Sequence, residues 1–296
     1  MACLLSYSDN YFYYIHLGCA ILSIFSSLFI VFFYYFTPQI QNYLYKLITN
    51  LAIAQLLSSM NFILPISLLK DTKTLCVLVG FIVNSGQITS IIWMACIAAT
   101  IYQIILHPAI PYEKYKKYWI VSAWFIVPIL NCIPIITDSF VPLGDTCTYN
   151  QDHTGTIERI CIFFIPVWFF IILTLYFYWK ILSQAKILKE ISDHSIIIKR
   201  LMLYPIIMAI NAIILTIARF ISLVIGKCDA TLIDFFSFIL IALNGFINFI
   251  IFLSIPNVYK ILREKFDKNQ MSFSVDSNDD RSFSLMLFES EKIVDA

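Results

Sequence analysis

Charge is what this sequence has least of. Charged residues make up 13% of its 296 residues, whereas hydrophobic residues make up 60%. The mean hydropathy of +0.81 is far above that of a water-soluble domain. The net charge is only +1, so no general basic field exists to attract nucleic acid, and we expect no nucleic-acid partner. The composition therefore predicts a membrane protein.

Histidine is also scarce, which argues against an intramembrane enzyme. The chain has four histidines, and three of them (His107, His153 and His194) fall in or near expected loops, which leaves His16 alone in a helix. A zinc site needs three or four converging ligands. No Ser/His/Asp set can be assembled within the membrane either. We therefore expect no metal, no catalytic residues and no enzymatic activity.

Lysine is absent from the last apolar run, and glycine is rare throughout. A retinal protein needs a lysine in its seventh helix to form a Schiff base, and there is none between Lys227 and Lys260. We therefore expect no cofactor. Transporters tend to show internal repeats and helices broken by Gly or Pro. This chain has only seven glycines and no repeat. A channel or transporter for a small solute nevertheless remains an alternative function.

Long runs without Asp, Glu, Lys or Arg are abundant. A membrane helix needs roughly 17 to 25 apolar residues, and seven runs satisfy this, the sixth being interrupted only by Arg219. They are too long and too uniformly apolar for the alternating strands of a barrel. The sequence predicts an all-α membrane protein, a seven-transmembrane-helix bundle over residues 11–255. The expected helices are 11–36, 43–69, 75–106, 117–137, 158–182, 196–225 and 232–255.

Basic residues determine the predicted orientation. Cytoplasmic loops carry the excess of Lys and Arg. With the N-terminus outside, the cytoplasmic side holds Lys46, Lys114, Lys116, Lys117, Lys180, Lys186, Lys189, Lys199, Arg200, Lys260, Arg263, Lys265 and Lys268. The other side holds Lys70, Lys73, Arg159 and Lys227. We therefore predict a multi-pass protein of the plasma membrane with an extracellular N-terminus.

The two ends of the chain differ from the bundle. Residues 1–10 have no basic signal-peptide region, and we expect a short extracellular N-terminus. Residues 256–268 place apolar side chains at helical spacing among charges, which predicts an amphipathic cytoplasmic helix contacting membrane lipids. Residues 269–296 are rich in Ser and acids and are expected to be a disordered cytoplasmic tail. Its serines are candidate sites for a receptor kinase and an arrestin-like partner, an unmodified solubilising tail being the alternative.

The cysteines suggest one disulfide. Cys76 begins the third helix and Cys147 lies in the loop before the fifth, both on the predicted oxidising side, so we expect them to pair. That loop, 138–158, contains Pro, Gly and Asp and is expected to be irregular. A second pairing of the outside Cys3 and Cys228 stays open. The remaining cysteines are expected to be small buried hydrophobic residues: Cys19, Cys96, Cys132 and Cys161.

Amides and one cation are the polar groups expected inside the membrane. In apolar surroundings such groups face the bundle interior and bond to one another or to a ligand. We assign polar packing to Asn50, Gln55, Asn211, Asn244 and Asn248.

Three residues of this set form the predicted ligand site. At ~1.5 Å per residue, Arg219 lies roughly 9 Å below the outer membrane surface, and Asn84 and Gln87 lie roughly 12 to 16 Å below Cys76. We therefore expect Arg219, Asn84 and Gln87 to bind an anionic ligand. The alternatives for Arg219 are an ion pair with Asp138 or Asp234, or snorkelling to the headgroups.

Prolines inside the runs predict bent helices. Each proline removes a backbone hydrogen bond, which can kink a helix or supply a hinge. The five are Pro65, Pro128, Pro134, Pro166 and Pro205. We expect hinges at Pro166 and at the pair Tyr204 and Pro205.

An ordered set of motifs across five helices resembles a known family. The set comprises Cys76, "GF" at 80–81 and Trp93; Trp124, Pro128 and Pro134; Gly144 and Cys147; "FFIPVW" at 163–168; "RLMLYP" at 200–205 followed by Arg219; and "NGFIN" at 244–248. Over roughly residues 40–260 the chain resembles the cyclic-AMP-receptor-like G protein-coupled receptors of slime moulds and other protists, with their fungal nutrient-sensing relatives. It departs from common receptor patterns at Gln55, where an acid is frequent, and in "TIYQII" at 100–105, which has no Asp-Arg pair.

The resemblance implies a function. It implies a cell-surface receptor that senses an extracellular small molecule, anionic and cyclic-nucleotide-like, and activates a heterotrimeric G protein. The expected G protein contacts are Lys114, Lys116, Lys117, Lys199 and Arg200. The alternative is that these residues serve membrane topology alone.

Overall fold

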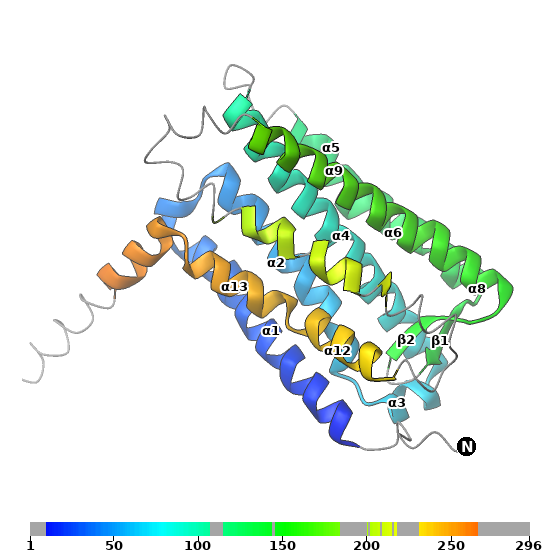
Figure 1. Cartoon of the computed structure of the whole chain (residues 1–296). Helices are drawn as coiled ribbons and strands as arrows, with labels where there is room; N and C mark the ends of the chain where they lie inside the picture. Colours follow the sequence, from blue (N-terminus) through cyan, green and yellow to red (C-terminus); the bar gives the residue numbers. More distant parts are fainter. Residues whose placement is uncertain are drawn as a thin grey trace, which may run out of the picture. The chain divides into compact units, whose positions relative to one another are not determined.

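The structure is a computed structural model that describes residues 10–106, 115–143, 146–183, 200, 202–207, 209–214, 216–217 and 231–265. The chain divides into two compact units, Met1–Phe252 and Leu253–Ala296. In the first unit, helices lie along one another and a small β-hairpin covers one end (Figure 1). We call this the hairpin end, and the end where α4 finishes at Leu106 the opposite end.

Helices and one hairpin make up the described part of the first unit. The elements are α1 (Asn10–Phe36), η1 (Pro38–Ile40), α2 (Tyr43–Ser59), η2 (Met60–Phe62), α3 (Ile66–Asp71), α4 (Lys73–Leu106), α5 (Lys116–Val121), η4 (Ser122–Ile126), α6 (Val127–Asn131), α7 (Ile133–Ile136), β1 (Phe140–Leu143), β2 (Thr146–Tyr149), α8 (His153–Glu158), η5 (Arg159–Phe164), α9 (Ile165–Ser183), α12 (Thr231–Ala242) and α13 (Asn244–Leu253). Residues 202–207, 209–214 and 216–217 are helical as well, inside the sixth predicted run.

Several of these elements are long and apolar enough to cross a membrane. Among the described residues they are Tyr13–Phe36, Lys73–Leu106, Lys116–Ile136 and His153–Ser183, with Phe235–Ala242 and Asn244–Leu253 as a fifth span bent by 43°. α2 and the helical residues 202–207, 209–214 and 216–217 occupy the two remaining predicted runs. The prediction of an all-α bundle of seven membrane helices agrees with this arrangement.

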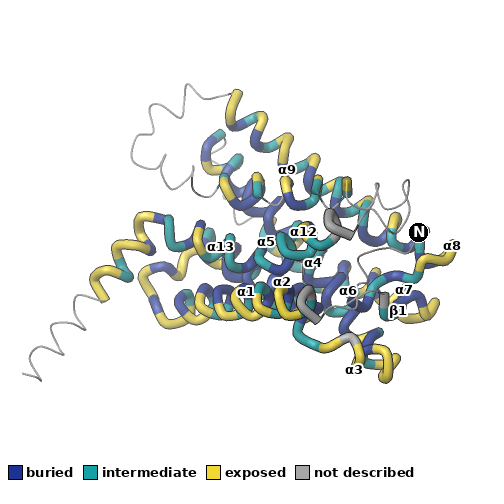
Figure 2. The backbone as a smooth tube through the Cα atoms, turned by 60° about the horizontal axis from the view of Figure 1, so that its bottom comes forward, coloured by how far each residue is buried: buried dark blue, intermediate teal, exposed yellow. Residues whose placement is uncertain are grey.

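Helix α4 is the centre of the bundle. It contacts α2 on one side and α9 on another, and Trp93 and Cys96 on it are fully buried. By contrast, α1 and α9 show long exposed runs in Figure 2. Those runs are apolar, with Phe25 69% and Trp179 63% exposed. Large apolar side chains exposed along a whole helix are expected where lipid, rather than water, is the solvent.

The second predicted helix is shorter than expected. We expected one helix over 43–69, but α2 ends at Ser59, η2 follows, and α3 begins only after Pro65. Pro65 has extended backbone angles (φ −66°, ψ 141°). Because proline has no N–H and disfavours a helical residue before it, the run breaks there.

Two prolines follow π-helical segments. η4 precedes Pro128 closely and η5 precedes Pro166, and both segments are π-helices. A proline cannot donate to the carbonyl four residues earlier, and widening the turn to π geometry accommodates that loss. The predicted distortion at these prolines is therefore a local widening.

The bend between α12 and α13 has no proline. The Gly245 N–H donates to Ser23 Oγ on α1 at 3.0 Å, so a side chain inserts into the helix's own hydrogen-bond ladder. A Cβ on Gly245 would lie 2.3 Å from Ser23 Oγ and 2.5 Å from Ser27 Oγ. The bend thus arises where α1 and α13 approach at a glycine, a cause that proline positions could not predict.

The loop expected to be irregular forms an antiparallel hairpin instead. β1 pairs with β2 in the register Phe140 with Tyr149 and Val141 with Thr148. Alternating β-branched and aromatic residues favour strands. The helix that follows also begins earlier than the predicted residue 158, because Asp152 caps α8 by accepting a hydrogen bond from the Gly155 N–H at 2.7 Å.

The predicted burial of the single cysteines holds only in part. Cys96 is buried and Cys19 half-buried, but Cys132 and Cys161 are exposed. Their helices present these faces to the apolar surroundings of the bundle, where a thiol is tolerated as a small hydrophobic group. Cys3 and Cys228 lie outside the described residues.

In the second unit, residues 256–265 are helical. This helix occupies most of the predicted amphipathic segment. Val258 is its fully buried apolar residue, whereas Tyr259 is 62% exposed. Residues 266–296 lie outside the described part.

Candidate functional site

The hairpin is tied to α4 by the predicted disulfide. Cys76, in the first turn of α4, bonds to Cys147 of β2 with an S–S distance of 2.02 Å and a Cα–Cα distance of 5.4 Å. This confirms the pairing inferred from the sequence. Gly80, one turn further on α4, lies against the ring of Phe140, and a Cβ there would come within 2.9 Å of that ring. The hairpin therefore rests directly on the helix.

Tyr149 anchors the other side of the hairpin. It is 1% exposed, and its hydroxyl donates to Asn131 Oδ1 on α6 at 3.4 Å. Burial raises the pKa of Tyr149, the Glu158 carboxylate raises it further, and the Arg159 guanidinium lowers it in part. The phenol therefore stays neutral and keeps its proton for the hydrogen bond.

Arg159 is a cation that bonds directly to this hairpin. It is half-buried at the start of η5, and its Nη2 donates to the Tyr149 carbonyl and, at 3.5 Å, to the Asn150 carbonyl. Asp152 and Gly155 form the cap that starts α8, which carries the chain from the hairpin to Arg159. The local fold thus brings a guanidinium back under β2.

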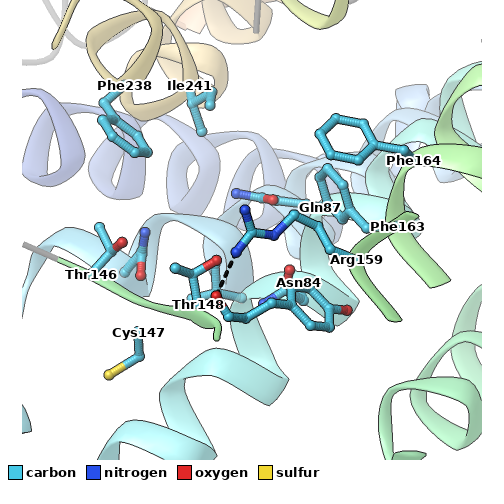
Figure 3. A pocket seen from close by; sticks show the side chains of 13 residues that line it. Asn84, Gln87, Thr146, Cys147, Thr148, Arg159, Phe163, Phe164, Phe238 and Ile241 are labelled. Atoms are coloured by element: carbon cyan, nitrogen blue, oxygen red, sulfur yellow. Dashed lines mark hydrogen bonds between the residues drawn. The ribbon is translucent and has the colours of Figure 1, made fainter. Parts of the chain in front are cut away.

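A cavity of about 70 Å³ lies beside Arg159. Figure 3 shows Asn84 and Gln87 entering it from α4, Arg159, Phe163 and Phe164 from η5, and Phe238 and Ile241 from α12. Asn61 of η2 and the β2 residues Thr146 to Tyr149 complete the lining. Arg159 is the only charged side chain among these described lining residues. The cavity combines one cation, several amides and hydroxyls, and four aromatic rings.

A second cavity of about 50 Å³ continues from the first toward the middle of the bundle. The two share Gln87, Phe163, Phe164 and Ile241. Its polar residues include Asn211 and Asn244, whose side chains bond to each other at 3.2 Å. Gln87 therefore lies between the first cavity, which contains the charge of Arg159, and the second, which is neutral but polar.

The structure brings two of the three predicted ligand residues together. Asn84 and Gln87 line the same cavity, while Arg219 lies outside the described residues. Of the acids suggested as its partners, Asp138 forms an ion pair with Lys73, both side chains being exposed. The side chain of Asp234 is outside the described part. Ligand binding by Arg219, Asn84 and Gln87 stays a prediction.

The residues assigned to polar packing behave in two ways. Asn50 accepts a hydrogen bond from Trp124 Nε1 at 3.1 Å, which joins α2 to η4, and Asn211 and Asn244 pair as described above. Gln55 and Asn248 are each 1% exposed, and their side-chain atoms have no hydrogen-bond partner within the described residues. Buried amides of this kind are sites for ordered water.

The predicted hinge residues are located but not tested. Pro166 follows the π-helical η5. Tyr204 is fully buried, and its hydroxyl donates to the Asn248 carbonyl at 3.3 Å. Pro205 lies one residue later, next to a small apolar cavity between α4 and α9. Hinge motion at these positions stays a prediction.

Of the predicted G protein contacts, three are described: Lys116, Lys117 and Arg200. Lys116 and Lys117 begin α5, and Arg200 is helical and exposed. Lys114 and Lys199 lie outside the described residues.

Arg159 is the charged residue of the cavity that the sequence analysis did not assign to the site. It served there only as a marker of topology, although it follows the loop of Cys147 directly and begins an apolar run. Those two features could have identified it as a cation next to a disulfide-held loop. In the described part of the chain no group of three His, Cys, Asp or Glu residues is placed to hold a metal.

Comparison with known proteins identifies the fold. No protein-family model matches the chain, and no curated protein matches it. The crystal structure of squid rhodopsin aligns with a TM-score of 0.65 over 88% of this chain and 86% of that chain, at 16% sequence identity. The chain therefore has the seven-helix fold of that protein. The likeness at this identity concerns the fold alone, and this chain has no lysine between Lys227 and Lys260.

Proposed function

We propose that the chain is a G protein-coupled receptor that senses an extracellular small molecule and activates a heterotrimeric G protein. The observation that carries this proposal is the cavity under the hairpin, in a bundle with the fold of squid rhodopsin. Small-molecule sites are concave, mostly apolar and supplied with a few fixed polar groups. This cavity is concave and combines aromatic rings with a few polar groups, and the bundle around it has an opposite end bearing Lys116 and Lys117.

The lining favours a small ligand with an anionic group and a flat apolar part. A guanidinium presents planar N–H donors that match carboxylate and phosphate oxygens. The rings of Phe163, Phe164 and Phe238 offer apolar faces beside it. Asn84 and Gln87 supply amide groups of the kind that pair with the edges of a base or a sugar hydroxyl. A cyclic-nucleotide-like ligand, as the family resemblance implies, has all three of these chemical features.

The signalling step would be a shift between two arrangements of the bundle. A ligand moves such an equilibrium only if it binds one arrangement more tightly. The cavity is bounded by η5 and α12. The first is the π-helical segment before Pro166, and the second ends at the bend before Gly245. A ligand that draws these elements together would change their packing at the opposite end, where the basic residues would meet an acidic surface of the G protein.

Ligand-dependent G protein activation tests the proposal. Cells expressing the chain would be screened with cyclic nucleotides and related small anions, with G protein dissociation measured by energy transfer. We expect at least one compound to give a saturable response that cells without the chain do not show.

A flux assay separates the receptor from the channel or transporter. The same cells would be tested for uptake of the active compound and for membrane current. Activation without flux supports the receptor, whereas uptake or current without activation would exclude it in favour of the alternative.

A further inference from the structure

A further cavity lies at the opposite end of the bundle, far along the helices from the hairpin. Its volume of about 320 Å³ exceeds the values of about 70 and 50 Å³ for the two cavities described above. Ala99 and Gln103 of α4 form its floor, Tyr118 and Trp119 of α5 with Ser122 of η4 form one wall, and Phe177 of α9 forms the other. We call this space the α5/α9 groove.

The α5/α9 groove opens onto the apolar outside of the bundle. Tyr118 at its edge is 73% exposed, and Phe125, further along the same span, is 59% exposed. On the α9 side, Tyr176 and Trp179 are 46% and 63% exposed. These helices are long and apolar enough to span a membrane, so their outward faces meet lipid. We therefore expect the occupant of the groove to come from the membrane.

The walls of the groove suit a hydrocarbon chain. Ser122 lies three residues after Trp119 and four after Tyr118, so it is a neighbour of each on the helix surface. Phe177 is held in place by Tyr102 of α4, with ring centroids 5.2 Å apart. Ala99, whose side chain is a single methyl group, leaves the space between these rings unfilled.

Cations flank both walls at the same end. Lys180 follows Phe177 by one turn of α9, and its Nζ lies 5.3 Å from the ring centroid of Trp179 and 5.8 Å from that of Tyr176. Lys116 lies in the first turn of α5, next to the residues of the other wall. Among the described residues, neither lysine forms an ion pair with an acid. Lysine beside Trp and Tyr is typical of the headgroup level of a membrane.

We propose that the α5/α9 groove binds an anionic phospholipid. One acyl chain lies among Tyr118, Trp119 and Phe177, and Lys116 and Lys180 hold the phosphate and the negative headgroup. The site is separate from the cavity under the hairpin and does not depend on the identity of the receptor's ligand. A sterol would fill the groove through its rings and would have no use for the two lysines.

Native mass spectrometry of the purified full-length chain tests this proposal. The protein would be titrated with phosphatidylglycerol and phosphatidylcholine of identical acyl chains, and the bound molecules counted. We expect retention of phosphatidylglycerol over phosphatidylcholine. Each of Lys116→Gln and Lys180→Gln should lower that preference roughly fivefold, as expected for one basic residue at an anionic headgroup.

Two further variants make the result decisive. Ser122→Phe fills the groove with a ring and should reduce binding of both lipids. Lys117→Gln removes the same charge at the next residue, about 100° around α5 from Lys116, and should leave the preference unchanged. Thermal unfolding of each variant identifies any that fail to fold, and the lysine variants alter only surface side chains.

Three outcomes would overturn the proposal. A loss in Lys117→Gln equal to that in Lys116→Gln would indicate diffuse surface charge. Full retention of phosphatidylglycerol by folded Ser122→Phe would place the lipid elsewhere. Displacement of phosphatidylglycerol by a sterol that binds equally well to Lys116→Gln and Lys180→Gln would make the groove a sterol site.

Discussion

Arg159 performs two tasks with one side chain. A guanidinium has five N–H donors in a plane, and its Nη2 is directed at the carbonyls of Tyr149 and Asn150. The same group lines the cavity beside Asn84 and Gln87. The hydrogen bonds to the hairpin hold the guanidinium in position, so a ligand anion would meet a cation already oriented toward it.

Substitution of Arg159 should weaken the response to the proposed anionic ligand. A charge-assisted hydrogen bond contributes about 1.5 to 3 kcal/mol, so Arg159→Gln should raise the half-maximal ligand concentration roughly 10- to 100-fold. Arg159→Lys keeps the charge but loses the planar arrangement of N–H donors. Its half-maximal ligand concentration should therefore lie between those of the original chain and Arg159→Gln. Dose–response curves for G protein activation measure this.

Lys73→Gln is the matched control. Lys73 is a cation of the same end of the bundle, paired with Asp138 on the surface and absent from the cavity lining. Its substitution removes the same charge without touching the cavity, so potency should not change. Equal losses in Lys73→Gln and Arg159→Gln would mean that only the general field of this surface matters.

At the level of elements, the hairpin depends on its disulfide. The bond closes a loop with a sequence separation of 71 between Cys76 and Cys147, and it holds β2 over the cavity. Cys76→Ser and Cys147→Ser should each lower the free energy of unfolding by about 2 to 4 kcal/mol and abolish ligand potency. Thermal unfolding in detergent and the activation assay measure the two effects.

Cys161→Ser is the control for the disulfide variants. Cys161 is a free, exposed cysteine in η5. Its substitution should therefore change neither the free energy of unfolding nor the ligand potency. If the double variant Cys76→Ser/Cys147→Ser kept full potency, the hairpin would not need this bond to form the site.

Close helix packing depends on two glycines. A Cβ on Gly86 of α4 would lie 2.8 Å from the Ser58 backbone nitrogen of α2, and one on Gly245 would lie 2.9 Å from the Ser23 carbonyl oxygen. Backbone atoms cannot turn aside as a flexible side chain can, so the helices would have to separate. Gly86→Ala and Gly245→Ala should each lower stability by about 1 to 3 kcal/mol through overpacking.

Gly18→Ala provides the comparison for these variants in thermal unfolding. Gly18 is also in a helix, but nothing lies within 4 Å of a Cβ there. Alanine favours helix over glycine, so this variant should be as stable as the original chain or slightly more stable. An unchanged melting temperature in Gly86→Ala and Gly245→Ala would show that α2 and α1 can move away at little cost.

At the level of the whole molecule, the charge distribution predicts the orientation. The N-terminus should face the outside and the C-terminus the cytoplasm, because most basic residues near the membrane ends follow that arrangement. An epitope tag at the N-terminus should bind antibody on intact cells, and a tag at the C-terminus only after permeabilisation. The reverse pattern would place the hairpin cavity in the cytoplasm and contradict the proposed function.

Much of the fold was predictable because lipid imposes simple requirements. A span must be long, apolar and satisfied in its backbone hydrogen bonds, so the runs 11–36 and 75–106 agree closely with α1 and α4. The break at Pro65 and the hairpin at 140–149 were less predictable. Whether a proline breaks a helix, and whether a loop becomes a strand, depends on which neighbours pack against it.

The site was predictable only in part. Asn84 and Gln87 could be placed in one cavity from their spacing on a single helix. Arg159 could not, because its position beneath β2 results from the disulfide, the hairpin register and the Asp152 cap acting together. The disulfide in particular joins residues with a sequence separation of 71, which become neighbours only when the chain folds.

The sequence by itself determined that this chain is a bundle of membrane helices and that Cys76 pairs with Cys147. Hydropathy can be read from each run of residues, and the predicted side of the membrane indicates which cysteines can oxidise. Only the tertiary structure decided which polar groups meet. It placed Arg159 with Asn84 and Gln87, bent the last span where Gly245 meets Ser23, and left the α5/α9 groove open between Trp119 and Phe177. The physical reason is that contacts between helices depend on how their faces fit together, which no single run of residues specifies.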